Sequence, residues 1–510
     1  MKRRALIITL IACCTTLFGQ VHITVGSPDT WSAQELAPYV GQTVVFDVPI
    51  VVCSNASSTL TVSPWRIFQP ENQGVPGSEG YKTALHINGS TAMSLSGVSG
   101  YHRCGEKIYN LKAMVNSTYS LTWVSGEWRG NTRAELEDSI PDLGDYRLLV
   151  CGFNLENYFV ANYGSMGAEN YTKHQRQRQK IHKALMQINA DLYGLVELEK
   201  GDEAISEIVN DLNNDSKERN YQFFSDVSTS AVQKVDFVYD ANVLEPIGTP
   251  GNIDTEVQHR KKMLCFREKA TGEKFIFSIN HFKAMSGGSD SETRRVNEAR
   301  AVVSFYNSYR VAKSIRDADL LLMGDLNSYG YAKPIRTLVE NNLIDLHRVF
   351  HADSSYSYMF SGKASYIDHA ICNSTMCPQI TGMAAYHINS DEDDYYTYDK
   401  SSGDMTMFRC SDHDPVLVGL KLDSTLTYNP SPAVNAAEVL SGESDIFTIR
   451  NAKRENERSF YAIVSVSGVV VEMQEITSSM QEVRPPLQAG VYILYIYYDG
   501  QVYQKKIIVR

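Results

Sequence analysis

The chain has 510 residues, too many for a single hydrophobic core, so we expect roughly two to four domains. With 43% hydrophobic and 21% charged residues, its composition is that of an ordinary globular protein. The formal net charge of −11 argues against a protein that coats nucleic acid indiscriminately, although it leaves room for a local basic surface.

The first twenty residues predict an export signal. Lys2, Arg3 and Arg4 precede an apolar run that ends near Phe18 and is too short to span a membrane. We therefore expect residues 1–20 to be a signal peptide, and the mature chain to be secreted or attached to the cell surface without a transmembrane segment. Cys13 in "LIAC" offers the alternative of a lipoprotein acylated at that residue.

Residues 21–145 form a β-rich region by their pattern. Short apolar runs such as "TVVFDVPIVV" (43–52) and "YSLTWVSGEW" (119–128) are separated by Gly, Ser, Pro and Asn. No set of catalytic residue types stands out there.

Seven cysteines follow residue 20, and none has the spacing of a CxxC pair or a zinc site. Disulfides are allowed in an exported protein, and Cys53–Cys104 and Cys372–Cys377 are plausible bridges. The connectivity stays open, and an odd count leaves at least one thiol free.

From about residue 146 the pattern changes to alternating strands and helices. Helical spacing of apolar residues occurs in 178–190 and again in 291–316. Apolar runs typical of strands are "YRLLVCGF" (146–153), "DLYGLVEL" (191–198), "KFIFSIN" (274–280), "DLLLMGD" (319–325) and "PVLVGL" (415–420). With enough strands for two sheets, residues 146–422 predict a layered α/β domain.

A basic stretch, "KHQRQRQKIHK" (173–183), lies at the start of the first helical pattern. It fits a solvated helix face as well as a surface that contacts phosphate groups, and both interpretations stay open. Beyond the α/β domain, residues 423–438 are a polar linker with prolines. Residues 439–510 are again β-like and end in a hairpin with Asp499-Gly500 at its turn.

Polar residues with metal or proton chemistry stand at the ends of the central strands. They are Asn154, Glu156, Glu197, His281, Asp325, Asn327, Asp368, Asp412 and His413. Each alone fits a turn, a cap or a satisfied surface group. Together, oxygen ligands suit a hard cation such as Mg²⁺ or Ca²⁺, and two histidines can exchange protons near neutral pH. The absence of Cys or clustered His ligands argues against zinc.

These residues also carry a family resemblance. The motifs "FNLENYF", "GLVELE", "INHFK", "GDLNS", "SYIDHAI" and "SDHDPV" occur in this order between residues 146 and 422. This part of the chain resembles the endonuclease/exonuclease/phosphatase superfamily, and its motifs are most similar to those of the secreted extracellular-nuclease branch. The resemblance implies a four-layer α/β sandwich of two β-sheets flanked by helices. It also implies phosphoester hydrolysis that depends on Mg²⁺, with Ca²⁺ or Mn²⁺ as further candidates.

For the metal, the resemblance implies Glu197 as the principal ligand, helped by three further residues, Asn154, Glu156 and Asp412. Two positions depart from the family pattern. Glu156 stands where many members carry Asp, which leaves its metal role open, and Val196 replaces a frequent Gln without affecting the metal.

For the reaction, the resemblance implies that His413 activates the attacking water and that Asp368 orients its imidazole. Asp325 and Asn327 would position water and phosphate, and His281 would bind the phosphate or protonate the leaving oxygen. Two neighbours are expected to be structural instead: Asp414 as an ion-pair partner and His369 through packing or hydrogen bonding.

The flanking regions resemble known modules more loosely. "LAPYVGQTVVFDVPIVVCSN" (36–55) looks like the small β-barrels that precede such nucleases, with a fold like the oligonucleotide-binding (OB) fold. The C-terminal hairpin region (487–510) is similar to sorting domains of type IX secretion substrates in Bacteroidetes-like bacteria, which would make the secretion machinery a partner. An ordinary β-sandwich module is the alternative.

The leading hypothesis from sequence is a secreted metal-dependent nuclease that cleaves DNA, with RNA as a further substrate. A second hypothesis is a phosphatase or phosphodiesterase for inositol phosphates or phospholipid head groups. A third, from another class, is a surface binding protein with an inactive catalytic scaffold.

Overall fold

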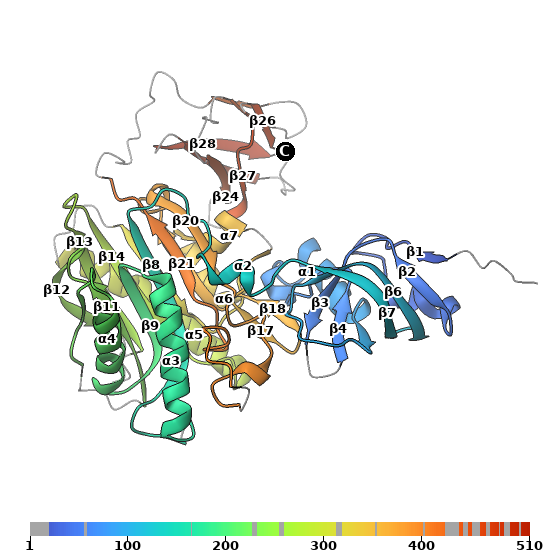
Figure 1. Cartoon of the computed structure of the whole chain (residues 1–510). Coiled ribbons are helices and arrows are strands. Elements are labelled where there is room, and N and C mark those ends of the chain that lie inside the picture. The colour runs from blue at the N-terminus through green and yellow to red at the C-terminus, as the bar shows by residue number, and fades with distance from the viewer. Residues whose placement is uncertain are drawn as a thin grey trace, which may run out of the picture.

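The protein is described by a computed structural model, in which an N-terminal barrel, a large central domain and a C-terminal β-region follow one another along the chain (Figure 1). The structure describes residues 20–55, 59–164, 166–226, 232–253, 260–312, 319–351, 354–400, 403–423, 438–441, 447–450, 459–465, 470–478, 480–483, 490–498 and 501–509. The predicted signal peptide therefore lies outside the described residues except for Gln20, as do most of the predicted linker and the turn residues Asp499 and Gly500. Along the described chain, no helix has the length and apolar character needed to cross a membrane.

The N-terminal region is a small barrel. Its strands are β1 (Val21–Ile23), β2 (Thr43–Phe46), β3 (Ile50–Ser54), β4 (Thr59–Ser63), β5 (Met93–Ser96), β6 (Lys107–Ser117) and β7 (Ser120–Arg129), with α1 (Glu79–Ser90) between β4 and β5. The pairings β3–β4, β4–β5, β5–β7, β7–β6 and β6–β3 close a ring around a buried apolar core. A closed barrel leaves these strands without a free edge. The assignment of this module to the OB-like folds stays a prediction.

The central domain contains two six-stranded sheets. The first has the order β10-β11-β9-β8-β21-β20 and the second the order β12-β13-β14-β15-β19-β16. The strands of the first sheet are β8 (Leu148–Tyr158), β9 (Leu192–Glu199), β10 (Tyr221–Phe223), β11 (Gln233–Asp240), β20 (Ile380–Ala385) and β21 (Val416–Leu420). Those of the second are β12 (Leu244–Asn252), β13 (Lys261–Glu268), β14 (Lys274–His281), β15 (Leu320–Asp325), β16 (Leu343–Asp345) and β19 (Asp368–Asn373).

The two sheets pack face to face, and helices cover their outer faces (Figure 1). Residues such as Val196, Phe277 and Met323 from both sheets share one buried cluster. The helices α3 (Tyr171–Ile188) and α4 (Glu203–Asp215) pack on the first sheet, and α5 (Gly288–Ala312) and α6 (Lys333–Glu340) on the second. The predicted α/β class, with two sheets flanked by helices and β-rich regions at both ends, is confirmed.

The strand register brings the predicted polar residues to one end of the second sheet. Strand β14 is parallel to β15 and pairs His281 with Asp325, while β19 is antiparallel to β15 and pairs Asp368 with Asp325. Gly324 allows this close approach, because a Cβ at that position would lie 2.0 Å from the carbonyl oxygen of Asn280. The φ angle of Gly324, 124°, is also one that side chains disfavour.

One strand boundary differs from the prediction. The sequence pattern places Asn154 and Glu156 beyond the first central strand, whereas β8 continues to Tyr158 and contains both. The apolar pattern ends at Phe153 because the strand passes from the interior of the sandwich to the polar site there.

The C-terminal region has a three-stranded sheet, β22-β23-β26, and a four-stranded sheet, β25-β24-β27-β28. Their bounds are β22 (Glu438–Ser441), β23 (Phe447–Arg450), β24 (Phe460–Ser465), β25 (Val470–Glu475), β26 (Met480–Val483), β27 (Gly490–Tyr498) and β28 (Gln501–Val509). The expected hairpin is present as the antiparallel pair β27–β28. Phe460 and Ala462 belong to the same buried cluster as Leu346 of α7 (Leu346–His351).

The cysteine bridges suggested by the sequence do not form. All seven cysteines of the described residues are buried free thiols, including Cys53, Cys104, Cys372 and Cys377. Each of them packs as a small apolar side chain in a core, which is among the most frequent environments of cysteine. The part of the chain that the structure describes is therefore held together without disulfides.

Candidate active site

The histidine of the "SDHDP" motif is paired with a carboxylate from a neighbouring strand. Nδ1 of His413, just before β21, lies 2.8 Å from Oδ2 of Asp368, the first residue of β19. Ser357 Oγ donates a hydrogen bond of 2.7 Å to the same carboxylate oxygen. His413 is 6% and Asp368 3% exposed, so the pair is shielded from bulk water. This arrangement leaves Nε2 as the imidazole nitrogen available for proton transfer.

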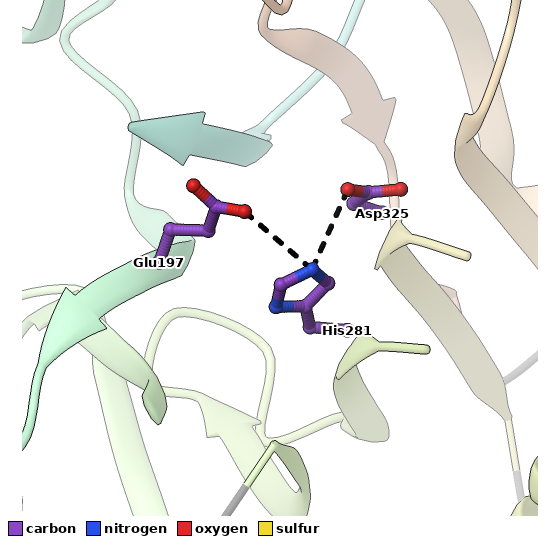
Figure 2. A group of neighbouring side chains, drawn as sticks. All are labelled: Glu197, His281 and Asp325. Atoms are coloured by element: carbon purple, nitrogen blue, oxygen red, sulfur yellow. Dashed lines mark ion pairs between the residues drawn. The ribbon is translucent and has the colours of Figure 1, made fainter. Parts of the chain in front are cut away.

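A second group of polar residues comes from three other strands. The Nε2 atom of His281 lies 3.6 Å from Oε1 of Glu197 and 3.7 Å from Oδ2 of Asp325, as Figure 2 shows. One ligand atom from each of these residues lies within 4.8 Å of the other two. Glu197 lies in β9 of the first sheet, whereas His281 and Asp325 end β14 and β15 of the second. Both sheets therefore contribute side chains to this group.

Asp325 connects the two groups. It lies within 4.8 Å of ligand atoms of Asp368 and His413 as well. Asn154 donates from Nδ2 to Asp325 Oδ2 at 3.1 Å, and Asn327 donates from its backbone N to Oδ1 at 2.8 Å and from Nδ2 to Oδ2 at 3.1 Å. Seven of the nine predicted site residues thus form one continuous cluster.

The remaining two, Glu156 and Asp412, flank this cluster. Asp412 Oδ1 lies 3.8 Å from Nε2 of His413, on the side of the ring opposite to Asp368. Glu156 has a buried Oε2 without a hydrogen-bond partner among the described residues. Neither carboxylate belongs to the sets of ligand atoms within 4.8 Å of one another. Their predicted roles as metal ligands stay predictions.

The backbone is strained at several of these positions. Glu156, Asn157, Glu197 and Asn327 have φ angles of 54°, 55°, 63° and 45°, in the left-handed region that few non-glycine residues adopt. Such strain costs free energy and persists where surrounding contacts enforce it, most often at functional sites. One enforcing contact is a 2.9 Å hydrogen bond from the backbone N of Asn157 to Glu197 Oε2.

Three carboxyl groups at the site, those of Glu156, Glu197 and Asp325, hold their protons more tightly than usual. Burial, reinforced by the charge of Asp412, raises the pKa of Glu156 to about 8 and also raises the pKa of Glu197. Burial raises the pKa of Asp325 to about 7, with Asp368 adding to the effect and His413 opposing it. Several buried carboxylates close together without a cation are costly.

The two histidines are shifted in opposite directions. Burial and the charge of Arg260 keep the pKa of His281 well below its usual value, so this ring is neutral at pH 7. Burial opposes charge on His413 as well, but the carboxylates of Asp368 and Asp412 outweigh it and raise the pKa of His413 well above its usual value. Two titratable groups whose pKa values are shifted in opposite directions are typical of acid–base sites.

The residues present fit a hard divalent cation. Glu197 and Asp325 offer carboxylate oxygens, and these lie within 4.8 Å of each other and of a His281 ring nitrogen. Positive charge at this point would also favour the ionised carboxylates, against the burial that raises the pKa of these acids. Oxygen donors in this number suit Mg²⁺, Mn²⁺ or Ca²⁺.

Sequence reasoning missed several residues that support the site. Ser357 holds Asp368, and the ring of Tyr358 lies 4.8 Å from the ring of His413, centroid to centroid. Arg260 Nη2 lies 2.8 Å from Nδ1 of His281. The charge of Arg409 lowers the pKa of Glu156, against the larger effect of burial. No motif singles these residues out, and only the fold brings them to the cluster.

The basic stretch 173–183 is largely occupied by contacts within the protein. Arg178 pairs with Asp211 at 2.6 Å, Lys173 pairs with Asp399 at 2.8 Å, and Lys183 donates to the carbonyl oxygen of Met405 at 2.6 Å. These contacts bind helix α3 to α4 and to the loop before β21. The two interpretations of this stretch, a solvated helix face and a phosphate-contacting surface, stay predictions.

Asp414 and His369 are structural, as expected. Asp414 is fully buried and accepts hydrogen bonds from the backbone N atoms of Asn389 and Ser390 at 2.8 and 2.9 Å. It also pairs with Nδ1 of His387 at 2.9 Å. His369 lies with Nε2 2.8 Å from the carbonyl oxygen of Ser328 and packs against Tyr366.

The motifs, the two-sheet sandwich and this cluster of acids and histidines agree with a comparison to known families. Residues 156–369 match the model of the Endonuclease/Exonuclease/phosphatase family. The central region carries a domain of this family. Enzymes of the family are phosphoester hydrolases that typically use divalent metals, and the chain has the residue types for both.

Solved structures of low sequence identity are similar to part of this chain. One is an endonuclease/exonuclease/phosphatase family protein from Bacteroides thetaiotaomicron, 17% identical over 55% of this chain and 98% of its own, with a TM-score of 0.40. A mannosyl-6-phosphatase from the same species is 17% identical over 54% of this chain and 100% of its own, with a TM-score of 0.39. The human Nocturnin catalytic domain is 12% identical over 54% of this chain and 94% of its own, with a TM-score of 0.38. No curated protein matches the chain.

Proposed function

We propose that the central domain is a metal-dependent nuclease that hydrolyses phosphodiester bonds of DNA and, as a further substrate, RNA. The observation that carries the proposal is the buried Asp368–His413 pair, 2.8 Å between Oδ2 and Nδ1, which meets the Glu197–His281–Asp325 group through the shared Asp325. A proton acceptor beside a set of cation ligands is what the hydrolysis of a phosphoester by water requires.

His413 is the residue that takes the proton from water. Its Nδ1 is committed to Asp368, so the ring is held in one orientation and Nε2 is the nitrogen that exchanges the proton. A bound cation would offset the carboxylate charges that favour the protonated ring, and the neutral ring would then accept the proton at Nε2. Asp368 then stabilises the positively charged ring. Asp412, 3.8 Å from Nε2, adds to that stabilisation, and the charges of Asp368 and Asp412 together raise the pKa of His413.

The other residues orient and stabilise. Asn154 and Asn327 fix the carboxylate of Asp325 through three hydrogen bonds of 2.8 to 3.1 Å, so Asp325 can position a water or a cation without moving. His281 is neutral and can donate a hydrogen bond to a phosphoryl oxygen. When a Mg²⁺ ion is held by Glu197 and its neighbours, it supplies positive charge for the developing negative charge of the phosphoryl group.

The site of action is proposed to be outside the cytoplasm. The basic and apolar residues 2–18 support export, and the similarity of residues 487–510 to type IX sorting domains supports delivery by that machinery to the medium or the cell surface. The N-terminal sequence of the protein recovered from culture medium tests this, because removal of residues 1–20 is expected.

The substrate class is tested with the purified mature protein. Supercoiled plasmid, a single-stranded RNA and a phosphomonoester such as an inositol phosphate are each incubated with Mg²⁺, and again with EDTA. The proposal expects nicking and linearisation of the plasmid with Mg²⁺ and none with EDTA. Release of phosphate from the monoester, with the plasmid and the RNA left intact, would contradict it and would favour a phosphatase.

A further inference from the structure

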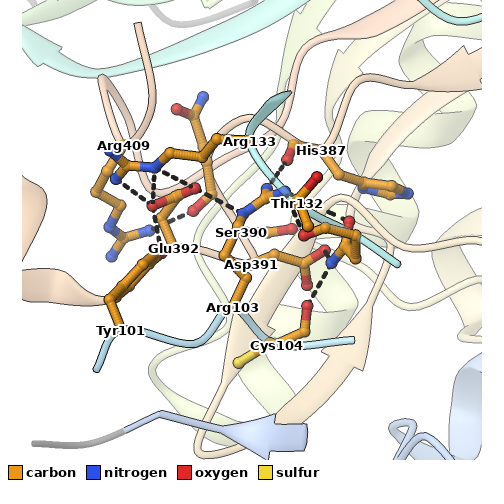
Figure 3. A network of polar contacts seen from close by, with 12 residues as sticks. Tyr101, Arg103, Cys104, Thr132, Arg133, His387, Ser390, Asp391, Glu392 and Arg409 are labelled. Atoms are coloured by element: carbon orange, nitrogen blue, oxygen red, sulfur yellow. Dashed lines mark hydrogen bonds and ion pairs between the residues drawn. The ribbon is translucent and has the colours of Figure 1, made fainter. Parts of the chain in front are cut away.

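The N-terminal barrel reaches the central domain through a fully buried carboxylate. Asp391, in the segment between β20 and β21, accepts hydrogen bonds from Arg66 Nη2 at 2.5 Å, Asn131 Nδ2 at 2.8 Å and Tyr356 Oη at 2.7 Å. Arg66 follows β4 and Asn131 follows β7, so two of the three donors belong to the barrel and its exit. Figure 3 shows Asp391 and its neighbour Glu392 within this polar network.

The charge on Asp391 depends on the barrel. Burial alone would raise the pKa of this carboxyl, but the positive charges of Arg66, His387 and Arg103 outweigh it and hold the pKa below its usual value. The Arg66 guanidinium also lies over the ring of Tyr356, 4.4 Å from its centroid. A buried carboxylate without such partners would be strongly unfavourable.

The residues directly before Asp391 hold the backbone of the catalytic histidine. Asn389 donates from Nδ2 to the carbonyl oxygen of His413 at 2.6 Å. The backbone N atoms of Asn389 and Ser390 donate to Oδ1 of Asp414 at 2.8 and 2.9 Å. The position of His413 is thus set by a segment whose end is fixed at Asp391.

The residue after Tyr356 holds the partner of that histidine. Ser357 donates from Oγ to Asp368 Oδ2 at 2.7 Å, and its carbonyl oxygen accepts from the backbone N of Asp414 at 2.8 Å. Tyr356 itself stacks on His387, with ring centroids 3.8 Å apart. Both segments that orient the Asp368–His413 pair therefore meet at Asp391.

We propose that Arg66 and Asn131 of the barrel are positioning residues for the Asp368–His413 pair, acting through Asp391. The barrel is then a part of the catalytic unit rather than a separate binding module. This inference rests on the proposed function for its kinetic consequence, whereas its structural consequence, ordering of residues 355–358 and 410–414, can be measured without any activity.

The test uses variants of the full mature chain. Arg66→Met alone leaves the buried Asp391 carboxylate without its closest cation and can prevent folding, so the main variant is the double substitution Arg66→Met with Asp391→Asn, which removes both charges. Arg66→Lys keeps the positive charge and serves as the conservative variant. Arg133→Gln is the matched control, because Arg133 crosses the same interface to Asp404 at 2.7 Å and to Glu392 but makes no contact with Asp391.

The first readout is amide hydrogen exchange by mass spectrometry. In the double variant, peptides covering 355–358 and 410–414 are expected to exchange about tenfold faster or more, with little change in Arg133→Gln and an intermediate change in Arg66→Lys. Unchanged exchange in these peptides overturns the inference. This result stands whether or not the protein proves to be a nuclease.

The second readout applies once wild-type activity is established. A small chromogenic phosphodiester, too short to reach the barrel, separates positioning from substrate binding. For the double variant we expect kcat to fall about tenfold or more with KM nearly unchanged, because small displacements of a catalytic pair are costly. A kcat equal to that of wild type, or a loss equal to that of Arg133→Gln, overturns the inference.

Discussion

Replacing Glu156 with Gln should flatten the pH dependence of stability of the metal-free protein. Glu156 has a pKa of about 8 in the folded protein because of burial and the charge of Asp412, against an ordinary value of 4.5. The folded state therefore binds a proton that the unfolded chain has released. The proton on Glu156 stabilises the folded state fully at a pH below the ordinary pKa of 4.5, and this stabilisation is lost as the pH rises toward 8.

The magnitude follows from proton linkage. Where the folded and unfolded states differ by one bound proton, the free energy of unfolding changes by about 1.4 kcal/mol per pH unit. From about pH 6 to about pH 7.5 the wild type should lose about 2 kcal/mol more than Glu156→Gln, which cannot titrate. For a domain of roughly 280 residues that is about 3–4 °C in Tm.

The assay is thermal unfolding in EDTA across this pH range, comparing wild type, Glu156→Gln and the surface variant Glu245→Gln. Only the difference between curves is interpreted, because the other titrating groups cancel in it. Addition of Mg²⁺ at the upper pH should raise the Tm of the wild type more than that of Glu156→Gln, since a bound cation favours the ionised carboxylate that burial disfavours. Parallel curves for wild type and Glu156→Gln would refute the reasoning.

Three further predictions concern the site and the core. Asp368→Asn should lower kcat by about 10²–10⁴-fold with KM unchanged in steady-state kinetics, because the imidazole of His413 loses its orienting charge, and a kcat within threefold of wild type would contradict this. Glu197→Gln should raise the Mg²⁺ concentration needed for half-maximal activity by about tenfold or more, whereas an unchanged titration would assign the ion to other ligands. Alkylation of the unfolded mature protein without reductant should label all seven cysteines after residue 20, and a label that appears only after reduction would reveal a disulfide.

The sequence predicted the fold of the central domain because its signals are local. Apolar runs such as 274–280 and 319–325 end at chemically distinctive residues, and β14 and β15 end at His281 and Asp325 as those runs imply. The parallel register then places both side chains at one edge of the sheet. Because such motifs occur in a recognisable order along the chain, the candidate site could be predicted from the sequence alone.

Contacts between distant segments were not predictable in the same way. Arg66 and Asp391 are separated by more than half the chain, and neither stands in a recognisable pattern, so their ion pair depends on how the barrel docks. The ion pairs of the basic stretch on α3 were unpredictable for the same reason, because its partners, such as Asp211 and Asp399, lie on other elements. The suggested bridge between Cys53 and Cys104 rested on the expected export of the protein, which allows disulfides. The fold instead buries both residues as free thiols.

The most direct test of the central claim is the rate of Mg²⁺-dependent plasmid nicking by His413→Ala, beside wild type and the control His182→Ala. His182 lies on α3 and pairs only with Asp215 at the surface among its described contacts, at 2.7 Å. If His413 is the group that takes the proton from water, His413→Ala should nick at least about 10²-fold more slowly, and His182→Ala at the wild-type rate. Nicking by His413→Ala at the wild-type rate would contradict the proposed mechanism and remove His413 from the reaction.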